Sequence, residues 1–463
     1  MTIEERIRDR KVGILGMARS GLAAAELVLD RGGMPFVSDS APADRVSEPI
    51  AKLQHLGISF ETDGHSDRLL ACDYLVVSPG VPLNIKILQR AREAGLPIFS
   101  ELEIASWVCP GRIVAITGSN GKTTTTTLMG EILTAAGFDT HVCGNIGRPL
   151  SEVVGRMTAD SIAVVEVSSF QLETVSLFKP CIAMILNLTP DHIDRHGSFE
   201  TYKKTKYRIT ENQTEADLFL LNHNDVESMT DDPPTQARKA YFSAATDDVS
   251  IAFESDGYLS TRDDRGVQQV IRCDEIAIKG PHNLQNASAA VAVATQLGVS
   301  IEVMRRVLTG FPGVEHRLED AGVVAGVAFV NDSKATNIDS VKWALRSIST
   351  PLYLILGGRD KGGQFGELIE IGRGKVKEII VIGEAKDKIT TALQESFSVK
   401  VANTLQDAVS VCFGQAHPGE TVLLSPGCAS FDMFDNYEHR GRVFKEAVQS
   451  LRNGKSRDEA VSH

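Results

Sequence analysis

The sequence predicts an α/β protein of three domains, each built around a mainly parallel sheet. Apolar runs of strand length alternate with helical stretches in three successive blocks, which is the pattern of βαβ units. The second block starts near Gly111, and the third starts at the breaker cluster Phe311-Pro-Gly313. We therefore expect domains at residues 1–110, 111–313 and 314–463.

The first block predicts a Rossmann-like domain. Its strands are expected at residues 12–15, 35–38 and 74–78, with a helix at 22–29. The turn Gly13–Gly21 resembles a dinucleotide-binding fingerprint, but Leu15 stands where the second glycine belongs, so NAD is disfavoured. Asp39 follows the second strand, where Rossmann proteins hold a ribose hydroxyl. We expect a nucleotide-bearing ligand with its phosphates at Arg19–Gly21; a glycine turn needed only for packing is the alternative.

The second block opens with a predicted phosphate-binding loop between an apolar strand and a helix. Gly118 and Gly121 let the backbone turn tightly, and the N–H groups that start the next helix attract anions. Lys122 adds positive charge and Thr123 offers a hydroxyl to Mg²⁺. The spacing departs from the common P-loop, because Ile116 stands where the first glycine belongs. We interpret the block as a P-loop ATPase-type domain; a plain strand-to-helix turn with a surface lysine is the alternative.

Acidic residues follow two further strands of this block, expected at residues 161–165 and 182–186. Glu166 ends the first, beside the phosphate loop, where Mg²⁺ is commonly held; a helix-capping glutamate is the alternative. Asp191–His196 follows the second and concentrates ionisable groups. Zinc is disfavoured there because the chain has no Cys-x-x-Cys pair, and a histidine that helps Mg²⁺ or contacts an anionic substrate fits better. A helix is expected at 286–296 and a peripheral hairpin within 247–272.

The third block carries three polar turns, at residues 331–337, 357–363 and 425–434, directly after strands expected at 327–330, 352–356 and 421–424. Carboxyl ends of parallel strands meet at one edge, so the turns should converge on a ligand. Glycine turns without a ligand are the alternative. A helix is expected at 338–348, another strand at 378–382, and a frayed polar tail after Leu451.

The composition of the 463-residue chain is that of an ordinary globular enzyme. The chain has 60 acidic and 48 basic residues, and this excess of negative charge argues against a surface that binds nucleic acid. No membrane-spanning run or secretion signal is apparent. The seven scattered cysteines favour free thiols in a reducing cytoplasm over disulfides or zinc. We expect a cytoplasmic protein, monomeric because no feature argues for an oligomer.

Seven segments occur in one order between residues 11 and 450: Ile-Thr-Gly-Ser-Asn-Gly-Lys-Thr-Thr, Glu-Val-Ser-Ser-Phe-Gln-Leu-Glu, Asn-Leu-Thr-Pro-Asp-His-Ile-Asp-Arg-His, Gly-Pro-His-Asn-Leu-Gln-Asn-Ala, His-Arg-Leu-Glu, Asn-Asp-Ser-Lys-Ala-Thr-Asn and Ser-Pro-Gly-Cys-Ala-Ser-Phe-Asp-Met-Phe. Together they resemble the ATP-dependent Mur ligases of peptidoglycan synthesis. The second and the last resemble members that add D-glutamate to UDP-N-acetylmuramoyl-L-alanine. The resemblance implies that ATP converts the substrate carboxylate into an acyl phosphate, which the amine of D-glutamate then attacks.

The resemblance also implies roles for individual residues. Catalysis would rest on Lys122, His192 and Lys206. ATP would bind at Gly118, Ser119, Asn120, Gly121, Lys122, Thr123, Thr124, Asn283, Asn286, Arg317 and Asp332. Two Mg²⁺ ions would be held by Thr123, Glu166, His192 and Lys206, with Lys206 carbamylated because an ammonium cannot bind a cation. The UDP-sugar would contact Arg19, Ser20, Asp39, Ser40, Gly80 and Asn145. D-Glutamate would contact Lys334, Thr336, Lys361, Ser430, Phe431 and Tyr437.

Two other functions remain open at this point. A folylpolyglutamate synthase would share the phosphate loop and the fold, but it would start at the ATPase domain, so the additional block at residues 11–105 argues against it. A regulatory protein could bind ATP and a UDP-sugar without catalysing a reaction. Phosphate release that depends on D-glutamate distinguishes all three functions.

Overall fold

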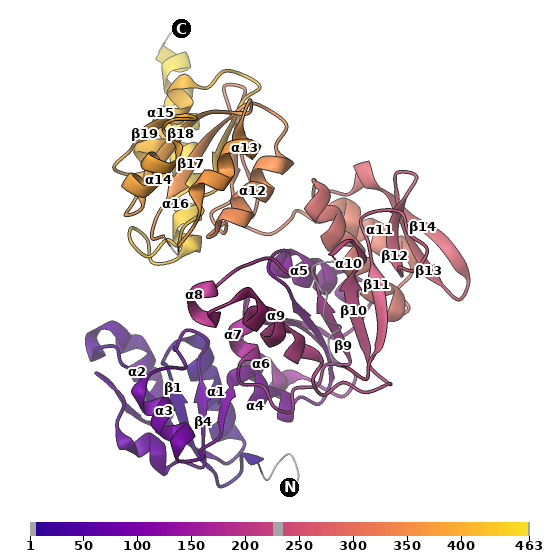
Figure 1. Ribbon diagram of the computed structural model, residues 1–463, viewed down its shortest axis with the longest axis vertical. Coiled ribbons are helices and arrows are strands. Elements are labelled where there is room, and N and C mark those ends of the chain that lie inside the picture. The colour runs from indigo at the N-terminus through magenta and orange to yellow at the C-terminus, as the bar shows by residue number, and fades with distance from the viewer. Residues whose placement is uncertain (1–5, 226–234, 361, 462–463) are drawn as a thin grey trace. The chain divides into compact units, whose positions relative to one another are not determined.

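The computed structural model describes residues 6–225, 235–360 and 362–461, without the side chains of Asp194 and 454–461. The chain divides into two compact units, Met1–Ala277 with Asn283–Phe311, and Ile278–His282 with Pro312–His463. The first unit contains two sheets and the second contains one (Figure 1). The predicted α/β class with three mainly parallel sheets is confirmed.

The N-terminal sheet has five parallel strands in the order β3-β2-β1-β4-β5. Its strands and helices are β1 (Lys11–Leu15), α1 (Arg19–Asp30), β2 (Met34–Ser38), α2 (Ser47–His55), β3 (Ser59–Glu61), β4 (Tyr74–Val77), α3 (Lys86–Glu93), β5 (Ile98–Ser100) and α4 (Glu101–Trp107). The chain leaves β1 toward β2 on one side and later returns to β4 on the other. Ligands of open α/β sheets bind at the carboxyl ends of strands at such a reversal.

The central sheet has nine strands in the order β14-β13-β12-β11-β10-β9-β6-β8-β7. Its elements are β6 (Arg112–Thr117), α5 (Lys122–Ala135), β7 (Thr140–Gly144), α6 (Leu150–Val153), β8 (Ile162–Glu166), α7 (Ser169–Leu172), β9 (Ile182–Ile185), α8 (Ile193–His196), α9 (Phe199–Tyr207), β10 (Leu218–Asn222), β11 (Arg238–Phe242), β12 (Ala252–Ser255), β13 (Tyr258–Asp263), β14 (Gly266–Arg272), α10 (Pro281–Gln296) and α11 (Ile301–Gly310). β6 is buried almost throughout, as expected of a strand covered on both faces.

An antiparallel hairpin, β13 with β14, ends this sheet and confirms the hairpin predicted within 247–272. It pairs with β12, which joins the parallel strands through β11. Arg305 of α11 reaches back over the last strand, and its Nε donates to the carbonyl oxygen of Val270 at 2.7 Å. The hairpin is therefore fastened to the helix that packs on it.

Two buried glutamates join the N-terminal sheet to the central one within the first unit. The carboxylate of Glu103 accepts hydrogen bonds from Trp107 Nε1 at 2.7 Å and from the backbone N–H groups of residues 176–178. Glu101 Oε1 accepts from the backbone N–H of Ser151 at 2.7 Å. These bonds fasten the two sheets to each other, because each carboxylate lies on α4 and the backbone N–H groups that it accepts from lie in the central domain.

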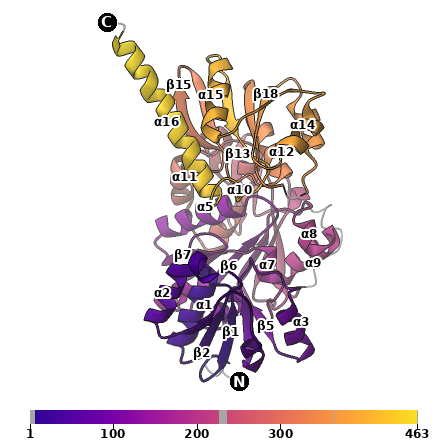
Figure 2. The same cartoon turned by 90° about the vertical axis from the view of Figure 1, so that its left-hand side faces the viewer.

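The second unit is a six-stranded sheet in the order β15-β16-β20-β17-β18-β19, parallel except for β15. Its elements are β15 (Glu319–Val324), β16 (Val327–Asn331), α12 (Ile338–Ser347), β17 (Leu352–Gly357), α13 (Leu368–Gly372), β18 (Val376–Ile382), α14 (Lys386–Leu393), β19 (Ser398–Val401), α15 (Leu405–Gln415), β20 (Thr421–Leu424) and α16 (Tyr437–Val461). Helix α16 is a single long helix whose backbone stays helical to Val461 (Figure 2). The prediction of a frayed tail after Leu451 is therefore wrong. Arg, Lys, Glu and Ala in this stretch favour helix.

Candidate active site

The phosphate loop lies between β6 and α5, as predicted. Gly118 has φ +150° and Gly121 has φ +83°, conformations that residues with a Cβ rarely adopt. A Cβ at Gly121 would lie 2.3 Å from Asn286 Oδ1. Lys122 Nζ donates to the carbonyl oxygens of Gly118 and Ser119, both at 2.8 Å. The loop thus presents a lysine and the N-terminus of a 14-residue helix at the carboxyl edge of the sheet.

Residues after β9 hold one side of this loop. Ser119 Oγ donates to the carbonyl oxygen of Thr189 at 2.8 Å. The side chain of Asn187 bonds both backbone groups of Asn120, at 2.8 and 3.1 Å. Asn187 and Thr189 were not predicted as site residues, although they follow a strand at the same sheet edge and that position was the available signal.

Helix α10 holds the other side of the loop. Asn286 Oδ1 accepts from Thr125 Oγ1 at 3.2 Å, and Asn286 Nδ2 donates to Asn283 Oδ1 at 3.1 Å. Both asparagines are buried. The structure therefore brings Asn283 and Asn286 to the loop, where the resemblance places ATP.

Glu166 lies at the end of β8 and is buried. Its Oε1 accepts from Asn145 Nδ2 at 2.9 Å, whereas its Oε2 is buried without a hydrogen-bond partner in the described part of the chain. The same holds for Thr124 Oγ1 on α5. A buried carboxylate oxygen with remaining coordination capacity beside a phosphate loop fits Mg²⁺, which prefers hard oxygen ligands.

Lys206 of α9 lies at the same edge and is completely buried. Its Nζ donates to Thr117 Oγ1 at 3.1 Å and to the carbonyl oxygen of Gly118 at 2.9 Å. Burial, and then the charge of Lys122, lower the pKa of Lys206 well below its usual value, against the charges of Asp191 and Glu166. These surroundings favour the neutral amine of Lys206 over its ammonium form.

His192 precedes α8 in the left-handed conformation, with φ 53°. Its ring meets that of Phe170 edge-on at 4.7 Å, and its Nε2 lies 3.6 Å from Asp191 Oδ2. His196, for which no role was expected, is buried and its Nε2 lies 3.0 Å from Ser169 Oγ. Of these two histidines, only His192 is exposed enough to contact a ligand.

A cavity of about 510 Å³ opens at the carboxyl edge of the N-terminal sheet. All six residues expected at the UDP-sugar line it: Arg19, Ser20, Asp39, Ser40, Gly80 and Asn145. His65 and Gln171, which were not predicted, line it too. The carboxylate of Asp39 accepts from the backbone N–H groups of Met17 and Ala41 at 2.7 and 2.8 Å, so it also braces the turns around the cavity.

The three polar turns of the second unit meet at one sheet edge, as expected. Arg440, fully buried, donates through Nε and Nη2 to the hydroxyl and carbonyl oxygens of Ser333, at 3.0 and 2.7 Å, and through Nη1 to the carbonyl oxygen of Cys428 at 3.2 Å. Arg359 and Ala429 exchange two backbone hydrogen bonds of 2.9 Å, which attach the third turn. Arg440 was not predicted; its partners lie about 100 residues away or on another turn.

Asp332, expected at ATP, lies buried between two of these turns. Its Oδ2 accepts from Ser425 Oγ at 2.8 Å and its Oδ1 from the backbone N–H of Leu318 at 3.2 Å. Burial raises the pKa of Asp332 to about 7, against the hydrogen bond from Ser425 and the charge of Arg317. Burial thus favours the protonated form of this carboxyl more than it would for an exposed aspartate.

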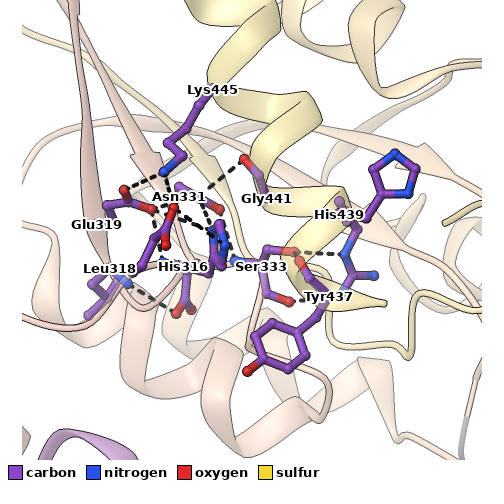
Figure 3. Close-up of polar contacts among 12 residues, drawn as sticks. His316, Leu318, Glu319, Asn331, Ser333, Tyr437, His439, Gly441 and Lys445 are labelled. Carbon is purple, nitrogen blue, oxygen red and sulfur yellow. Dashed lines mark hydrogen bonds and ion pairs between the residues drawn. The ribbon is translucent and has the colours of Figure 1, made fainter. Parts of the chain in front are cut away.

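The expected D-glutamate residues lie around the start of α16. Lys334 Nζ sits 5.4 Å from the ring centre of Tyr437, whose carbonyl oxygen accepts from Ser333 Oγ at 2.8 Å (Figure 3). Thr336 is half-buried, Ser430 is buried, and Phe431 is 64% exposed. Lys361, expected in the same pocket, lies outside the described residues.

A polar cluster near the start of the second unit surrounds His316 (Figure 3). Asn331 Nδ2 lies 3.0 Å from His316 Nδ1 and donates to Glu319 Oε2 at 2.9 Å. Lys445 Nζ bonds Glu319 Oε1 at 2.8 Å and also Glu315. Glu315, His316 and Glu319 bring potential metal ligands within 4.8 Å of one another, but both carboxylates already form an ion pair with Lys445. We interpret the cluster as structural.

The comparisons with known proteins agree along nearly the whole chain. Three family models match: "Mur ligase MurD-like, N-terminal domain" at residues 10–100, "Mur ligase middle domain" at 116–294 and "Mur ligase, glutamate ligase domain" at 316–428. A UDP-N-acetylmuramoylalanine--D-glutamate ligase of Acidobacterium capsulatum is 43% identical over 96% of this chain and 97% of its own. One of Koribacter versatilis is 41% identical over 96% and 98%.

Solved structures support the fold. A UDP-N-acetylmuramate-alanine ligase of Thermotoga maritima has a TM-score of 0.60 at 19% identity, covering 95% of this chain and 99% of its own. A MurF ligase of Thermotoga maritima in complex with ADP has a TM-score of 0.61 at 15% identity, covering 90% and 95%. Within the described residues, no helix is both long and apolar enough to span a membrane. The family models and the relatives above 40% identity establish that this chain is a member of the Mur ligase family.

Proposed function

We propose that the chain joins D-glutamate to UDP-N-acetylmuramoyl-L-alanine with conversion of ATP to ADP and phosphate, a step of peptidoglycan precursor synthesis. Relatives that are 41–43% identical over 96% of the chain carry the name of this ligase. One observation supports the proposal more than any other. Asn145 lines the N-terminal cavity and also donates to Glu166, so one side chain links this cavity to a carboxylate of the central sheet.

We assign the phosphate-transfer chemistry to the central edge. The amide groups of residues 118–124 and the charge of Lys122 would bind the ATP phosphates and stabilise the charge that develops during transfer. Thr123 and Glu166 would hold one Mg²⁺ ion, and His192 and Lys206 a second. Bound Mg²⁺ would supply the remaining positive charge that two approaching anions require.

Lys206 would act as a ligand after carbamylation. Its neutral amine can add to the carbon of dissolved carbon dioxide and lose one proton, which gives a carbamate whose two oxygens share one negative charge. Complete burial and the lowered pKa of Lys206 support this assignment, because only an unprotonated amine reacts. The amine also lies at Thr117 and Gly118, next to the phosphate loop.

The substrates would bind at the other two edges. The cavity residues Arg19, Ser20, Asp39, Ser40, Gly80 and Asn145 would receive the UDP-sugar. Arg317 and Asp332 would complete the ATP site, and D-glutamate would bind at Lys334, Thr336, Lys361, Ser430, Phe431 and Tyr437. We place the reaction in the cytoplasm, where ATP and nucleotide-sugars are available, and expect a monomer. All seven cysteines are free thiols, which agrees with a reducing compartment.

Phosphate release tests the proposal. The purified protein is incubated with ATP, Mg²⁺ and UDP-N-acetylmuramoyl-L-alanine, with and without D-glutamate, and with L-glutamate as the matched control. Release that requires D-glutamate, together with a product heavier by one glutamyl residue, is the expected result. Binding of both nucleotides without release would instead indicate a sensor, and release that ignores the UDP-sugar would refute the assigned substrate.

A further inference from the structure

The cavity of the N-terminal sheet contains a histidine held by a chain of hydrogen bonds. His65 lines the cavity, and its Nδ1 lies 2.8 Å from Oγ of Ser38, the fully buried last residue of β2. Ser38 Oγ is in turn 2.7 Å from Glu61 Oε1. Glu61 is itself anchored by Ser66, which donates its backbone N–H at 2.8 Å and its hydroxyl at 2.5 Å.

The positions of the protons follow from the first two links of this chain. Burial alone would raise the pKa of Glu61, but hydrogen bonds from Ser66 and Ser38 outweigh it and lower that pKa, so the carboxylate is ionised and only accepts. The single hydroxyl hydrogen of Ser38 therefore goes to Glu61 at 2.7 Å, in preference to the Gly64 carbonyl at 3.3 Å. Ser38 Oγ can then meet His65 Nδ1 only as an acceptor.

The ring of His65 consequently carries its hydrogen on Nδ1 and a lone pair on Nε2. Burial lowers the pKa of His65, against the charges of Asp39 and Glu61, which favours the neutral form of the ring. Nδ1 is occupied by Ser38, so Nε2 is the polar atom that His65 can offer to a ligand in the cavity. Glu61, two hydrogen bonds away, thus determines that Nε2 of His65 is a hydrogen-bond acceptor.

We propose that His65 is a specificity-determining residue, whose Nε2 accepts a hydrogen bond from a donor on the nucleoside end of the UDP-linked substrate. This rests on the proposed function only in taking that substrate as a uridine nucleotide. Uracil has one such donor, the imide N3–H, and its ribose has two hydroxyls. Cytosine instead presents a lone pair at N3, which would face the lone pair of Nε2. With the imide as the donor, the arrangement favours uridine over cytidine nucleotides; with a ribose hydroxyl as the donor, it favours ribonucleotides over dideoxynucleotides.

Two matched substitutions separate the cavity contact from the Ser38 contact. The amide of His65→Asn reaches the place of Nδ1 and can still donate to Ser38, but it offers nothing at the place of Nε2. The longer side chain of His65→Gln can bring its amide oxygen to the place of Nε2. The variant His65→Asn should therefore lose the hydrogen bond to the nucleoside, and His65→Gln should retain part of it.

The probes are UDP, CDP, N3-methyl-UDP and 2′,3′-dideoxy-UDP, with affinities measured by calorimetry. One hydrogen bond predicts that the wild type prefers UDP about three- to tenfold over the analogue that lacks the donor. If the imide is the donor, N3-methyl-UDP and CDP bind more weakly; if a ribose hydroxyl is, the dideoxy analogue does. His65→Asn should lose that preference and His65→Gln should recover part of it. In turnover, His65→Asn should raise KM for the UDP-substrate by the same factor and leave kcat within about twofold.

The inference is overturned if His65→Asn, with an unchanged Tm, keeps all four wild-type affinities. It is also overturned if Asn and Gln weaken all four ligands equally, because that would show a structural role. These outcomes differ from failure of the proposed function, since the binding assay contains neither ATP nor D-glutamate. If the wild type turns over the substrate and His65→Asn still prefers UDP, only the role of His65 is contradicted.

Discussion

The carboxyl edges of the central and C-terminal sheets both gather polar residues, but they treat buried charge in opposite ways. At the central edge, Glu166 Oε2 has no hydrogen bond from any residue that the structure describes, and Lys206 is buried strongly enough to lower its pKa. At the C-terminal edge, Arg440 directs three hydrogen bonds to the protein's own turns. The central edge retains polar atoms that can bind charged groups. At the C-terminal edge, the buried charge of Arg440 holds the protein's own turns together. We therefore propose that the central sheet carries the chemistry and that Arg440 of the C-terminal sheet positions the turns.

Removing Lys122 should have the largest effect, because the central edge would lose the charge that faces the transferring phosphoryl group. We expect Lys122→Ala to lower kcat at least about 10²-fold, which corresponds to roughly 3 kcal/mol of barrier, without changing the fold. Turnover at saturating ATP measures this, and circular dichroism checks the fold. Lys204→Ala, an exposed lysine on α9, is the matched control. Wild-type turnover in Lys122→Ala would refute the phosphate-loop interpretation.

Lys206→Ala should also inactivate the protein, but reversibly. Without the carbamate the site lacks a carboxylate-like ligand, and added formate or acetate should restore part of the activity by occupying the space. Carbon-13 NMR with labelled bicarbonate should show a carbamate in the wild type and none in Lys206→Ala. An active, Mg²⁺-loaded protein with unmodified Lys206 would contradict this prediction.

Arg440→Lys tests the fastening at the C-terminal edge. Lysine keeps the charge but cannot reproduce the planar fork, so two of the three hydrogen bonds should be lost. We expect the free energy of unfolding to fall by about 2 kcal/mol and KM for D-glutamate to rise, with a smaller change in KM for the UDP-sugar. Denaturant unfolding and steady-state kinetics measure the two effects. A destabilised variant with unchanged KM for D-glutamate would show that Arg440 does not position the acceptor site.

Asp39→Ala should have the smallest of these effects and should leave both edges intact. It removes an acceptor of two backbone N–H groups at the N-terminal cavity, so KM for the UDP-substrate should rise about tenfold while KM for ATP stays nearly unchanged. Asp39→Asn, which keeps one carbonyl acceptor, should show a smaller rise. If KM for ATP rose instead, the ATP site and the UDP-sugar site would have been assigned the wrong way round.

Local signals explain which parts of the molecule could be predicted. The loop between β6 and α5 was found because glycine, lysine and an apolar strand mark it within a dozen residues. Short or polar strands escaped prediction: β3 (Ser59–Glu61) and β19 (Ser398–Val401) exist because they pair with neighbouring strands. Their own residues carry little apolar pattern, so only tertiary contacts decide their state.

The parts of the sites that escaped prediction depend on contacts between distant residues. Arg440 acts on Ser333, 107 positions earlier, and nothing near Arg440 in the sequence marks that partner. His65 gains its importance from Ser38 and Glu61 on two different strands. The six residues expected at the UDP-sugar line one cavity, but the hydrogen bonds that set the proton positions of His65 became visible only in the fold.

The hairpin that ends the nine-stranded sheet also bears on the behaviour of the protein at high concentration. A terminal strand can template pairing with another chain, and β14 has Val267 56% exposed. Arg305 places a guanidinium on the Val270 carbonyl oxygen, so the backbone there is already occupied. We expect this contact to make pairing of β14 with another chain less favourable. A variant without it would fold and catalyse normally, yet would precipitate at lower concentration.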